Sequence, residues 1–332
     1  MERILITGGA GFIGHHLVSK LLPQRQYRII VVDNLSTGRK ENLFSDQSKS
    51  VNNGVPLSFY EEDILNTDRI FNIFKHEGAD TCIHLAAKTS VLDSTANPYH
   101  TVCVNIIGTL NILEACYKHG VKNFIFASSA AVYGEPQKLP IYEEDPLRPL
   151  SMYGASKVAG EALVSSYRSV GKIENAVSLR IFNVYGEGQS PDYAGVITAF
   201  IERLSKGLSP IIYGDGTQTR DFIFVQDVVD AIILAAKQSN KEKRFPPLLP
   251  SIFNIGTGIQ VSVSDLAIKM IKLFGLDLSP LYRDRVSNED IRRSCADITR
   301  LKKKLKFNIT HDLDHGLNQI RPLDSRTNVD AK

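Results

Sequence analysis

The chain has 332 residues, of which 43% are hydrophobic and 23% are charged, and 39 Lys and Arg against 36 Asp and Glu leave a formal charge of +3. This hydrophobic content with so small a net charge excludes an intrinsically disordered chain, and the length suffices for one large core or two smaller ones. The basic residues are scattered along the sequence, which gives no electrostatic argument for nucleic-acid binding.

The cysteines and the lengths of the apolar runs indicate the cellular compartment in which the protein functions. The 4 cysteines are widely separated and form no C-x-x-C pair, so we predict neither a disulfide framework nor a zinc site, and the thiols fit a reducing compartment. The histidines show no metal-ligand spacing either. No stretch approaches the ~18 consecutive apolar residues of a membrane span, and the start of the chain lacks the pattern of a signal peptide. We therefore expect a soluble cytoplasmic protein without a metal or a membrane partner.

Short apolar runs alternate with amphipathic segments through the first half of the chain. The runs predicted as strands buried on both faces are Ile4–Ile6, Ile29–Val32, Cys82–Leu85, Phe124–Ala127 and Ala176–Arg180. The segments predicted as helices are Gly14–Leu22, Thr67–His76, Asn105–His119 and Tyr153–Val170. This alternation is typical of βαβ units, and it predicts an α/β fold with a Rossmann-like, doubly wound parallel sheet covered by helices on both faces.

The second half of the chain has a different organisation. After about Arg180 the strict alternation weakens, and loop-like stretches separate helices from single short strands. We predict a dinucleotide-binding domain over residues 1–180 and a smaller α/β domain over residues 181–320, partly interleaved with the first. Residues 321–332 are polar and lack apolar periodicity, which predicts a mobile end.

A glycine-rich turn follows the first predicted strand and opens the first predicted helix. The segment Thr7–Gly14 fits G-x-x-G-x-x-G through Gly8, Gly11 and Gly14. Glycines allow a tight turn and close approach of a pyrophosphate, and the helix N-terminus directs its positive end at that group. At the first βα junction, with an acidic residue ending the second strand, this pattern predicts a dinucleotide site.

Acidic residues after the second and third strands refine the cofactor prediction. Asp33 ends the second strand, where a carboxylate accepts the ribose hydroxyls of NAD and repels the 2′-phosphate of NADP. Arg39 and Lys40 follow a few residues later and weaken the argument against NADP. Asp63 and Ile64 could hold the adenine edge, although an ordinary turn aspartate explains Asp63 almost as well.

A second group of residues has the side chains of a catalytic site. Tyr153 and Lys157 are spaced i and i+4, which places them on one helix face. A phenol has a pKa near 10 and is a poor base at neutral pH, but a nearby ammonium and a positive nicotinamide both favour the phenolate. Ser129 follows the fourth strand, at the carboxyl edge of the sheet where ligands of such folds bind. We expect Tyr153 to be a base, with Ser129 hydrogen-bonded to the oxygen that loses its proton.

At these residues the chain resembles the extended short-chain dehydrogenase/reductase superfamily, and within it the nucleotide-sugar 4-epimerases of the UDP-galactose 4-epimerase type. The resemblance spans nearly the whole chain to about Phe307, and it rests on Thr7–Gly14, Asp33–Leu35, His84–Ala87, Ser128–Gly134, Tyr153–Lys157, Arg180–Gly186, Tyr213–Gly216, Arg220–Phe222 and Ser294–Asp297. It implies a catalytic set of Ser129, Tyr153 and Lys157, with NAD as the cofactor. The implied cofactor contacts are Gly8, Gly11, Phe12, Ile13, Gly14, Asp33, Asn34, Asp63, Ile64, Leu85, Ala86, Ala87, Lys88, Asn105, Tyr153 and Lys157.

The same resemblance implies contacts to a UDP-sugar in the second half of the chain. The implied substrate residues are Ser129, Asn183, Gly195, Val196, Tyr213, Arg220, Arg285, Asp290 and Ser294. By the likeness, Asn183 and Arg220 bind the diphosphate, Tyr213 stacks on the uracil, and Gly195 and Val196 meet the base through their backbone. The family's Arg-x-Gly-Asp segment is changed around residues 283–290 by an apparent insertion and the loss of the glycine. Arg285 is the best candidate there for a second phosphate ligand.

The residues after Ser129 separate possible reactions. Dehydratases and decarboxylases of this superfamily carry carboxylates there, whereas this chain has Ala130 and Ala131, which cannot transfer a proton. We therefore expect NAD-dependent 4-epimerisation of a UDP-hexose through a transient 4-keto sugar. A dehydratase, decarboxylase or reductase of the same fold is the alternative. A non-catalytic NAD-binding protein is a third hypothesis, against which the intact Ser129, Tyr153 and Lys157 set argues.

The sugar and the oligomer remain open at this point. By the resemblance, Ser294 occupies a position that gates the size of the sugar, and a small residue there admits UDP-GlcNAc/UDP-GalNAc beside UDP-Glc/UDP-Gal. A UDP-glucuronate 4-epimerase is a further alternative, although the sequence identifies no partner for the uronate carboxylate. The resemblance also implies a homodimer, packed through the predicted helices Asn105–His119 and Tyr153–Val170.

Overall fold

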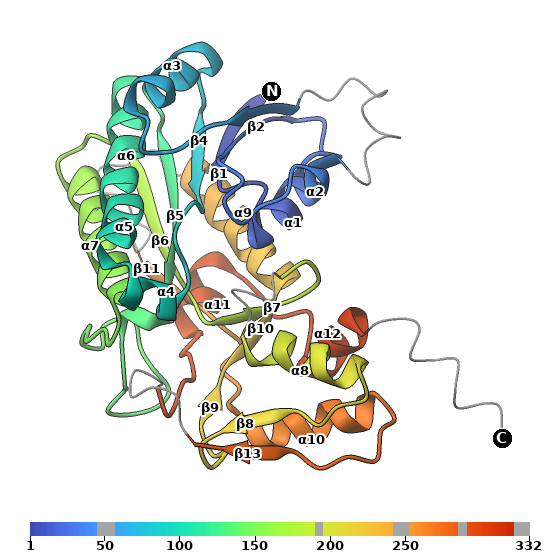
Figure 1. Cartoon of the computed structure of the whole chain (residues 1–332). Helices are drawn as coiled ribbons and strands as arrows, with labels where there is room; N and C mark the ends of the chain where they lie inside the picture. The colour runs from blue at the N-terminus through green and yellow to red at the C-terminus, as the bar shows by residue number, and fades with distance from the viewer. Residues whose placement is uncertain (45–56, 190–194, 242–251, 285–290, 322–332) are drawn as a thin grey trace.

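The computed structural model describes residues 1–44, 57–189, 195–241, 252–284 and 291–321. Its centre is a seven-stranded parallel sheet in the order β11-β6-β5-β4-β1-β2-β3 (Figure 1). These strands are β1 (Glu2–Thr7), β2 (Tyr27–Asp33), β3 (Leu57–Glu61), β4 (Thr81–His84), β5 (Asn123–Ser129), β6 (Asn175–Ile181) and β11 (Ile252–Ile255). The predicted fold class, a Rossmann-like doubly wound parallel sheet, is confirmed, and each of the five predicted strands is present.

The strand order creates one point at which the chain reverses its direction of progress across the sheet. From β1 the chain moves outward through β2 to β3, and it then returns to place β4 on the other side of β1. The loops that leave β1 and β4 therefore separate at their carboxyl ends, where an open α/β sheet binds ligands. Thr7 pairs in register with Val32 and His84 at this edge. The edge sets the place of the functional site.

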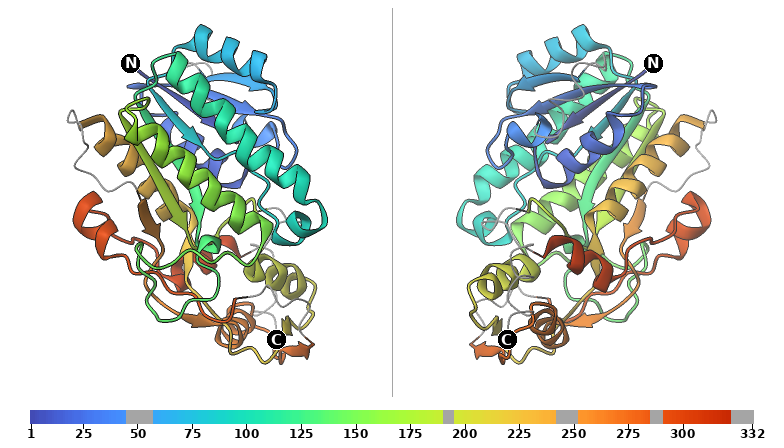
Figure 2. Two further views of the ribbon diagram at one scale, coloured as in Figure 1. Left: turned by 90° about the vertical axis from the view of Figure 1, so that its left-hand side faces the viewer. Right: turned by 90° about the vertical axis from the view of Figure 1, so that its right-hand side faces the viewer.

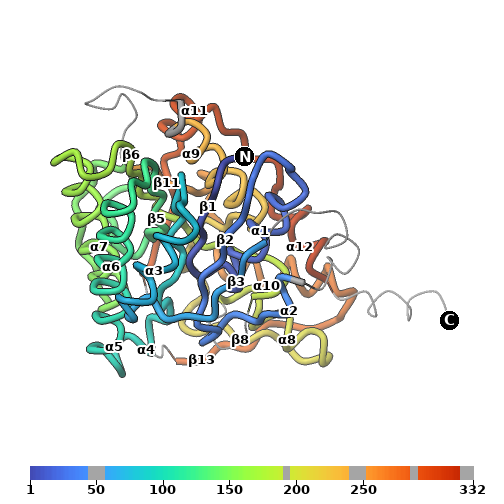
Figure 3. Tube along the Cα trace, turned by 90° about the horizontal axis from the view of Figure 1, so that it is seen from above, coloured from blue at the N-terminus to red at the C-terminus, as the bar shows by residue number. Residues whose placement is uncertain are grey.

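Helices cover both faces of the sheet, as seen along the sheet in Figure 3. On one face lie α1 (Phe12–Leu21), α9 (Val225–Lys241) and α11 (Thr299–Leu305), whose apolar side chains share a core with β1, β2 and β6. On the other face lie α3 (Thr67–Glu77), α6 (Thr109–Lys118) and α7 (Met152–Ser169). The strands read as continuous apolar runs because both of their faces are buried.

The predicted helix Asn105–His119 is in fact two pieces. A π-helical turn, η2 (Cys103–Gly108), precedes α6, and two short helices, α4 (Val91–Ala96) and α5 (Pro98–Val102), lead into it. Asn105 lies in the π turn and is only 2% exposed. Such turns often occur at functional sites.

A smaller region lies beyond the carboxyl edge of the sheet, at the bottom of both views in Figure 2. It contains three two-stranded pairs, β10 (Phe222–Phe224) with β7 (Asn183–Tyr185), β12 (Val261–Ser262) with β9 (Thr219–Arg220), and β13 (Leu281–Arg283) with β8 (Ile211–Tyr213). Its helices are α8 (Val196–Ser205), α10 (Val263–Leu273) and α12 (Leu313–Ile320). Phe200, Ile212 and Met270 are fully buried in its own apolar cluster.

The two regions exchange segments. Strand β11 and helix α9 come after residue 181 in the chain, yet β11 is an edge strand of the large sheet and α9 packs on the sheet.

A short helix, α2 (Glu41–Phe44), follows β2. Of the predicted mobile tail, Arg321 is described and residues 322–332 lie outside the described residues. The predicted substrate residues Arg285 and Asp290 lie outside the described residues as well. Among the described helices, none has the length and apolarity needed to cross a bilayer.

Candidate active site

The turn between β1 and α1 has no room for side chains. Gly8 has a φ of +71°, and a Cβ on it would lie 2.7 Å from the backbone nitrogen of Ala86. A Cβ on Gly14 would lie 2.2 Å from the carbonyl oxygen of Gly8. Gly11 precedes α1 and has no side chain to cap it. The backbone of this turn can therefore approach a phosphate closely, and the helix N-terminus is directed at it.

Asp33 is fixed beside this turn. Its carboxylate accepts hydrogen bonds from the backbone N–H groups of Ala10 (2.9 Å) and Leu35 (2.8 Å). Burial raises the pKa of Asp33, and the hydrogen bonds from the backbone oppose that rise. The side chain is held at the end of β2 in a fixed orientation, as recognition of a ribose requires.

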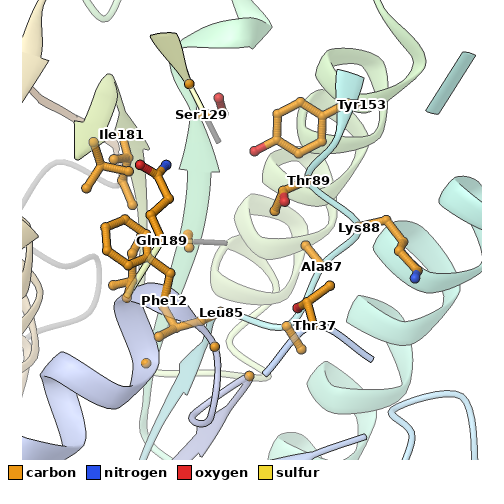
Figure 4. Close-up of a pocket in the computed structure, with 18 of the residues that line it drawn as sticks. Phe12, Thr37, Leu85, Ala87, Lys88, Thr89, Ser129, Tyr153, Ile181 and Gln189 are labelled. Atoms are coloured by element: carbon orange, nitrogen blue, oxygen red, sulfur yellow. The ribbon is translucent and has the colours of Figure 1, made fainter. Parts of the chain in front are cut away.

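A cavity of about 840 Å³ extends from this turn across the carboxyl edge of the sheet, within the volume range typical of ligand sites. The predicted cofactor residues that line it are Gly8, Gly11, Phe12, Ile13, Gly14, Asp33, Asn34, Ile64, Leu85, Ala86, Ala87, Lys88, Tyr153 and Lys157. A glycine turn, a buried carboxylate and a cavity of this size fit a bound dinucleotide. Figure 4 shows Lys88 directed away from Tyr153, with Ala87 and Thr89 on the wall between them.

Three predicted site residues lie outside the lining of this cavity. Asp63 accepts a hydrogen bond from Asn34 Nδ2 at 2.8 Å. Asn105 accepts from the backbone N–H of Lys88 and donates to its carbonyl oxygen, at 2.8 and 2.9 Å. Ser294 is 5% exposed and is absent from the wall. Asp63 and Asn105 thus hydrogen-bond two residues that line the cavity, Asn34 and Lys88, and their own contacts to the cofactor stay predictions.

The expected chemical residues meet at one part of the cavity. Tyr153 lies near the start of α7, Ser129 ends β5, and the Ser129 hydroxyl lies close enough to the phenol to lower its pKa. Lys157 Nζ lies 5.9 Å from the centroid of the Tyr153 ring and donates to the carbonyl oxygen of Ala127 at 2.8 Å. In Figure 4 the Tyr153 ring faces the space between Ser129 and Thr89. This geometry can take a proton from a hydroxyl held by Ser129.

Burial dominates the acid–base properties of this pair. It raises the pKa of the Tyr153 phenol, and the hydrogen bond with Ser129 only partly opposes the rise. Burial also lowers the pKa of Lys157 to about 8. The sequence argument expected the ammonium to favour the phenolate, but in the structure burial acts on Tyr153 in the opposite direction.

The wall of the cavity also contains polar residues that the sequence did not indicate. They include Thr37, Glu62, Thr89, Gln189 and Gln218. Gln189 lies opposite Ser129 beside Phe12 and Ile181 (Figure 4), and its side chain accepts a hydrogen bond from Thr198 at 3.0 Å. Its signal in the sequence is its place directly after the Arg180–Gly186 motif.

The smaller region closes the other end of the cavity. The predicted substrate residues that line the cavity are Ser129, Asn183, Gly195, Val196, Tyr213 and Arg220. Gly195 and Val196 form the uncapped start of α8, whose N–H groups favour an anion or an acceptor. Tyr213 is 45% exposed at the end of β8. The cavity therefore joins a dinucleotide cradle to a second site that carries an arginine and an aromatic ring.

Comparison with known proteins gives a family. Residues 4–256 match the model of the NAD dependent epimerase/dehydratase family. The chain belongs to this family. A putative UDP-glucose 4-epimerase of Methanocaldococcus jannaschii is 39% identical, over 96% of each chain.

Two solved structures share the fold over nearly the whole chain. The crystal structure of UDP-glucose 4-epimerase with UDP-glucose from Thermotoga maritima has a TM-score of 0.86 and 37% identity, and the match covers 96% of this chain and 97% of that one. UDP-N-acetylglucosamine 4-epimerase from Methanobrevibacter ruminantium, in complex with UDP-N-acetylmuramic acid, has a TM-score of 0.84 and 34% identity, over 96% of each chain. The cofactor of this chain is NAD, in agreement with the acidic end of β2.

The place of Asp33 gives a first prediction. Replacing Asp33 with asparagine keeps the shape of the side chain but removes its charge, and hydrogen bonds to charged groups contribute about 1.5–3 kcal/mol. We expect the Kd of NAD to rise at least about tenfold and the discrimination against NADP to weaken. Calorimetric titration with both dinucleotides measures this. In the control Asp68→Asn, at an exposed position in the first turn of α3 outside the cavity lining, NAD should bind as in the wild type, and an equal loss there would contradict the assignment.

Proposed function

We propose that this chain interconverts the C4 epimers of a UDP-hexose, with UDP-Glc/UDP-Gal as the first pair and UDP-GlcNAc/UDP-GalNAc as the second. NAD-dependent 4-epimerisation of a UDP-sugar is the activity that its relatives support. The observation that carries the proposal is the contact between Tyr153 and Ser129 in front of the dinucleotide cradle. The two residues after Ser129 are Ala130 and Ala131, at positions where a dehydratase or decarboxylase would need carboxylic acid side chains.

The residues act on the hydroxyl at C4. Ser129 hydrogen-bonds to the hydroxyl oxygen, and Tyr153 removes its proton as the general base. Bound NAD supplies the acceptor for the C4 hydride and a positive charge that favours the phenolate. Tyr153 would return the proton to the C4 oxygen once the sugar has turned over and C4 is reduced on its other face. Lys157, held by the carbonyl oxygen of Ala127, keeps a second positive charge behind the phenol.

The smaller region would hold the part of the substrate that does not react. We assign Asn183 and Arg220 to the diphosphate, because an arginine fork fits phosphate oxygens. Tyr213 is placed to stack on the uracil, and the start of α8 at Gly195 can meet the base through its N–H groups. With the UDP part anchored there, the sugar can rotate at the other end of the cavity.

The local structure after β5 favours epimerisation over elimination. Ala130 and Ala131 form the start of a 3-10 turn, η3 (Ala130–Val132), and the Ala131 N–H donates to Ser129 Oγ at 3.2 Å. Their methyl groups cannot protonate a leaving hydroxyl or remove a ring proton. Loss of water or CO₂ requires an acid–base group beside Ser129, and the two described residues that follow Ser129 provide none, whereas epimerisation uses the Ser129, Tyr153 and Lys157 set with the cofactor.

The product ratio tests the proposal. Purified enzyme is incubated with UDP-Glc, UDP-GlcNAc and UDP-GlcA in parallel, and the products are followed by NMR. We expect one or both of the first two to reach a mixture of C4 epimers, without net consumption of NAD and without release of water or CO₂. A 4-keto, 6-deoxy or pentose product would replace the proposal by a dehydratase or decarboxylase. Epimerisation of UDP-GlcA alone would identify a uronate epimerase.

We also propose a homodimer in the cytoplasm. The helices α4, α5, η2 and α7 pack against one another, and α4, α5 and α7 lie on one side of the molecule (Figure 1, left). Apolar side chains exposed on these elements are Leu92 (67%), Tyr99 (82%), Ile107 (46%) and Met152 (38%). Exposed apolar side chains gathered in this way are typical of a protein interface. All 4 cysteines are free thiols, which supports a reducing compartment.

A single charge tests the interface. Placing glutamate at position 99 replaces the most exposed of these apolar side chains with a carboxylate, and burial of such a charge in an interface is costly. We expect Tyr99→Glu to sediment as a monomer at concentrations where the wild type is a dimer. The control Ile268→Glu changes a side chain that is 58% exposed on α10, and it should remain a dimer. A monomeric wild type would refute the assignment.

A further inference from the structure

An ion pair is buried under the proposed active site. Arg180 of β6 and Glu161 of α7 have side chains that are 3% and 5% exposed, and Arg180 Nη2 lies 2.7 Å from Glu161 Oε2. Arg180 Nε donates to Glu161 Oε1 at 2.9 Å, which makes the contact bidentate. Ser128 Oγ donates to the same oxygen at 2.5 Å. A buried ion pair usually adds little to stability over apolar packing, so its position needs a separate explanation.

The carboxylate lies between the two halves of the proposed machinery. Glu161 follows Lys157 by one turn of α7, so the two side chains share a helix face. Ser128, which donates to Glu161, directly precedes Ser129 at the end of β5. The Lys157 ammonium also lies 4.9 Å from the centre of the Phe126 ring on this strand. One buried anion therefore touches the strand end that carries Ser129 and stands beside Lys157.

We propose that Glu161 is a positioning residue for the reaction: its carboxylate, fixed by Arg180 and Ser128, keeps the Lys157 ammonium charged behind Tyr153. The proposal rests on the proposed roles of Tyr153 and Lys157. Glu161 takes no part in proton transfer, because Arg180 and Ser128 occupy its oxygens.

The charges that face Lys157 explain why an anion is needed. On its own helix lie Tyr153 and Glu161, on β4 lies His84, and on β6 lies Arg180. Burial lowers the pKa of Lys157 to about 8, and Glu161 opposes that fall. His84 is neutral, because burial and the nearby Lys157 lower its pKa to about 3. Among these groups Glu161 is the anion that acts on the Lys157 ammonium, and its carboxylate also pairs with the Arg180 guanidinium at 2.7 Å.

The Arg180 nitrogen that does not contact Glu161 binds Tyr133 and Glu143, and Glu143 provides a matched control for Glu161. Arg180 Nη1 donates to Tyr133 Oη at 2.8 Å and to the carbonyl oxygen of Glu143 at 2.9 Å. The Glu143 carboxylate accepts from the backbone N–H of Asn254 at 3.0 Å and is 2% exposed. Glu143 thus belongs to the same buried network as Glu161, but Arg180 separates it from Lys157.

The experiment compares Glu161→Gln with Glu143→Gln in the holoenzyme. The pH dependence of kcat and KM is measured with the UDP-sugar that the wild type epimerises. The phenolate of Tyr153 is titrated by ultraviolet absorbance, as the difference from Tyr153→Phe. In Glu161→Gln we expect the alkaline limb of the pH profile, where kcat falls as the pH rises, to lie at least about one pH unit lower than in the wild type. KM should change little. Activity falls there because Lys157 loses its proton at a lower pH. Glu143→Gln should keep the wild-type limb and titration.

A double variant covers the case in which Glu161→Gln does not fold. Glu161→Gln/Arg180→Gln removes both buried charges, so no unpaired arginine is left in the core. Its alkaline limb should lie below that of the wild type and above that of Glu161→Gln. An alkaline limb and a phenolate titration equal to the wild type, in a folded variant without the carboxylate, would overturn the inference. Full turnover by Tyr153→Phe would instead overturn the proposed function, so the two failures are distinguishable.

Discussion

Replacing Tyr153 with phenylalanine is expected to lower kcat by about 10²- to 10⁴-fold, the usual contribution of a positioned general acid–base. The aromatic ring remains in its place near the start of α7, and only the hydroxyl that contacts Ser129 is lost. Binding of NAD and of UDP should be unchanged, because the phenol is not needed to hold either. Turnover is measured from the approach to the epimer equilibrium, and binding by calorimetry.

The control removes another partly buried phenol. Tyr60 lies on the outer strand β3, and its hydroxyl donates a hydrogen bond to Glu77 Oε1 at 2.6 Å. Tyr60 does not line the cavity. Tyr60→Phe loses this hydrogen bond, so it should cost about 1 kcal/mol of folding free energy while kcat stays at the wild-type value. If Tyr153→Phe turned over at the rate of Tyr60→Phe, Tyr153 could not be the base.

The central sheet could be predicted because its strands have no polar face. Ile29–Val32 and Phe124–Ala127 are apolar at every position, since helices cover both sides of a parallel sheet. The signal weakens at the edge strand β11, where Asn254 interrupts the apolar run. In the structure this side chain is fully buried, and it is satisfied by the Tyr133 hydroxyl and the Ile141 carbonyl oxygen. Partners more than one hundred positions away leave no local trace in the sequence.

The candidate site could be predicted where its chemistry depends on a short segment. The glycine turn and the Tyr153–Lys157 pair are local patterns, and both line the same cavity. Asn105 and Asp63 are predicted as cofactor contacts, and their hydrogen bonds to Lys88 and Asn34 depend on how separate segments meet, which leaves no local pattern in the sequence. Burial of the phenol, which raises the pKa of Tyr153, also depends on tertiary packing rather than on helix spacing.

The glycine turn gives the second large expected effect, from Gly14→Ala. Gly14 is buried, and a single methyl group there would lie 2.2 Å from the Gly8 carbonyl oxygen and 2.6 Å from Gly9 Cα. Backbone atoms cannot move aside as a flexible side chain can, so α1 must shift away from the end of β1. We expect a loss of about 1–3 kcal/mol in the free energy of unfolding from overpacking. The turn would then no longer approach the pyrophosphate, and NAD affinity should fall at least about tenfold.

Gly195→Ala is the matched control, because a Cβ on Gly195 meets nothing within 4 Å. Urea unfolding and NAD titration of the two variants separate a steric effect at the cradle from a general cost of replacing glycine. For Gly195→Ala we expect wild-type stability and NAD affinity, since alanine needs no space there that the protein lacks. Wild-type NAD affinity in Gly14→Ala would mean that the cofactor does not depend on close approach to this turn. The cavity would then need another anchor for the dinucleotide, and the orientation of the nicotinamide toward Tyr153 would lose its structural basis.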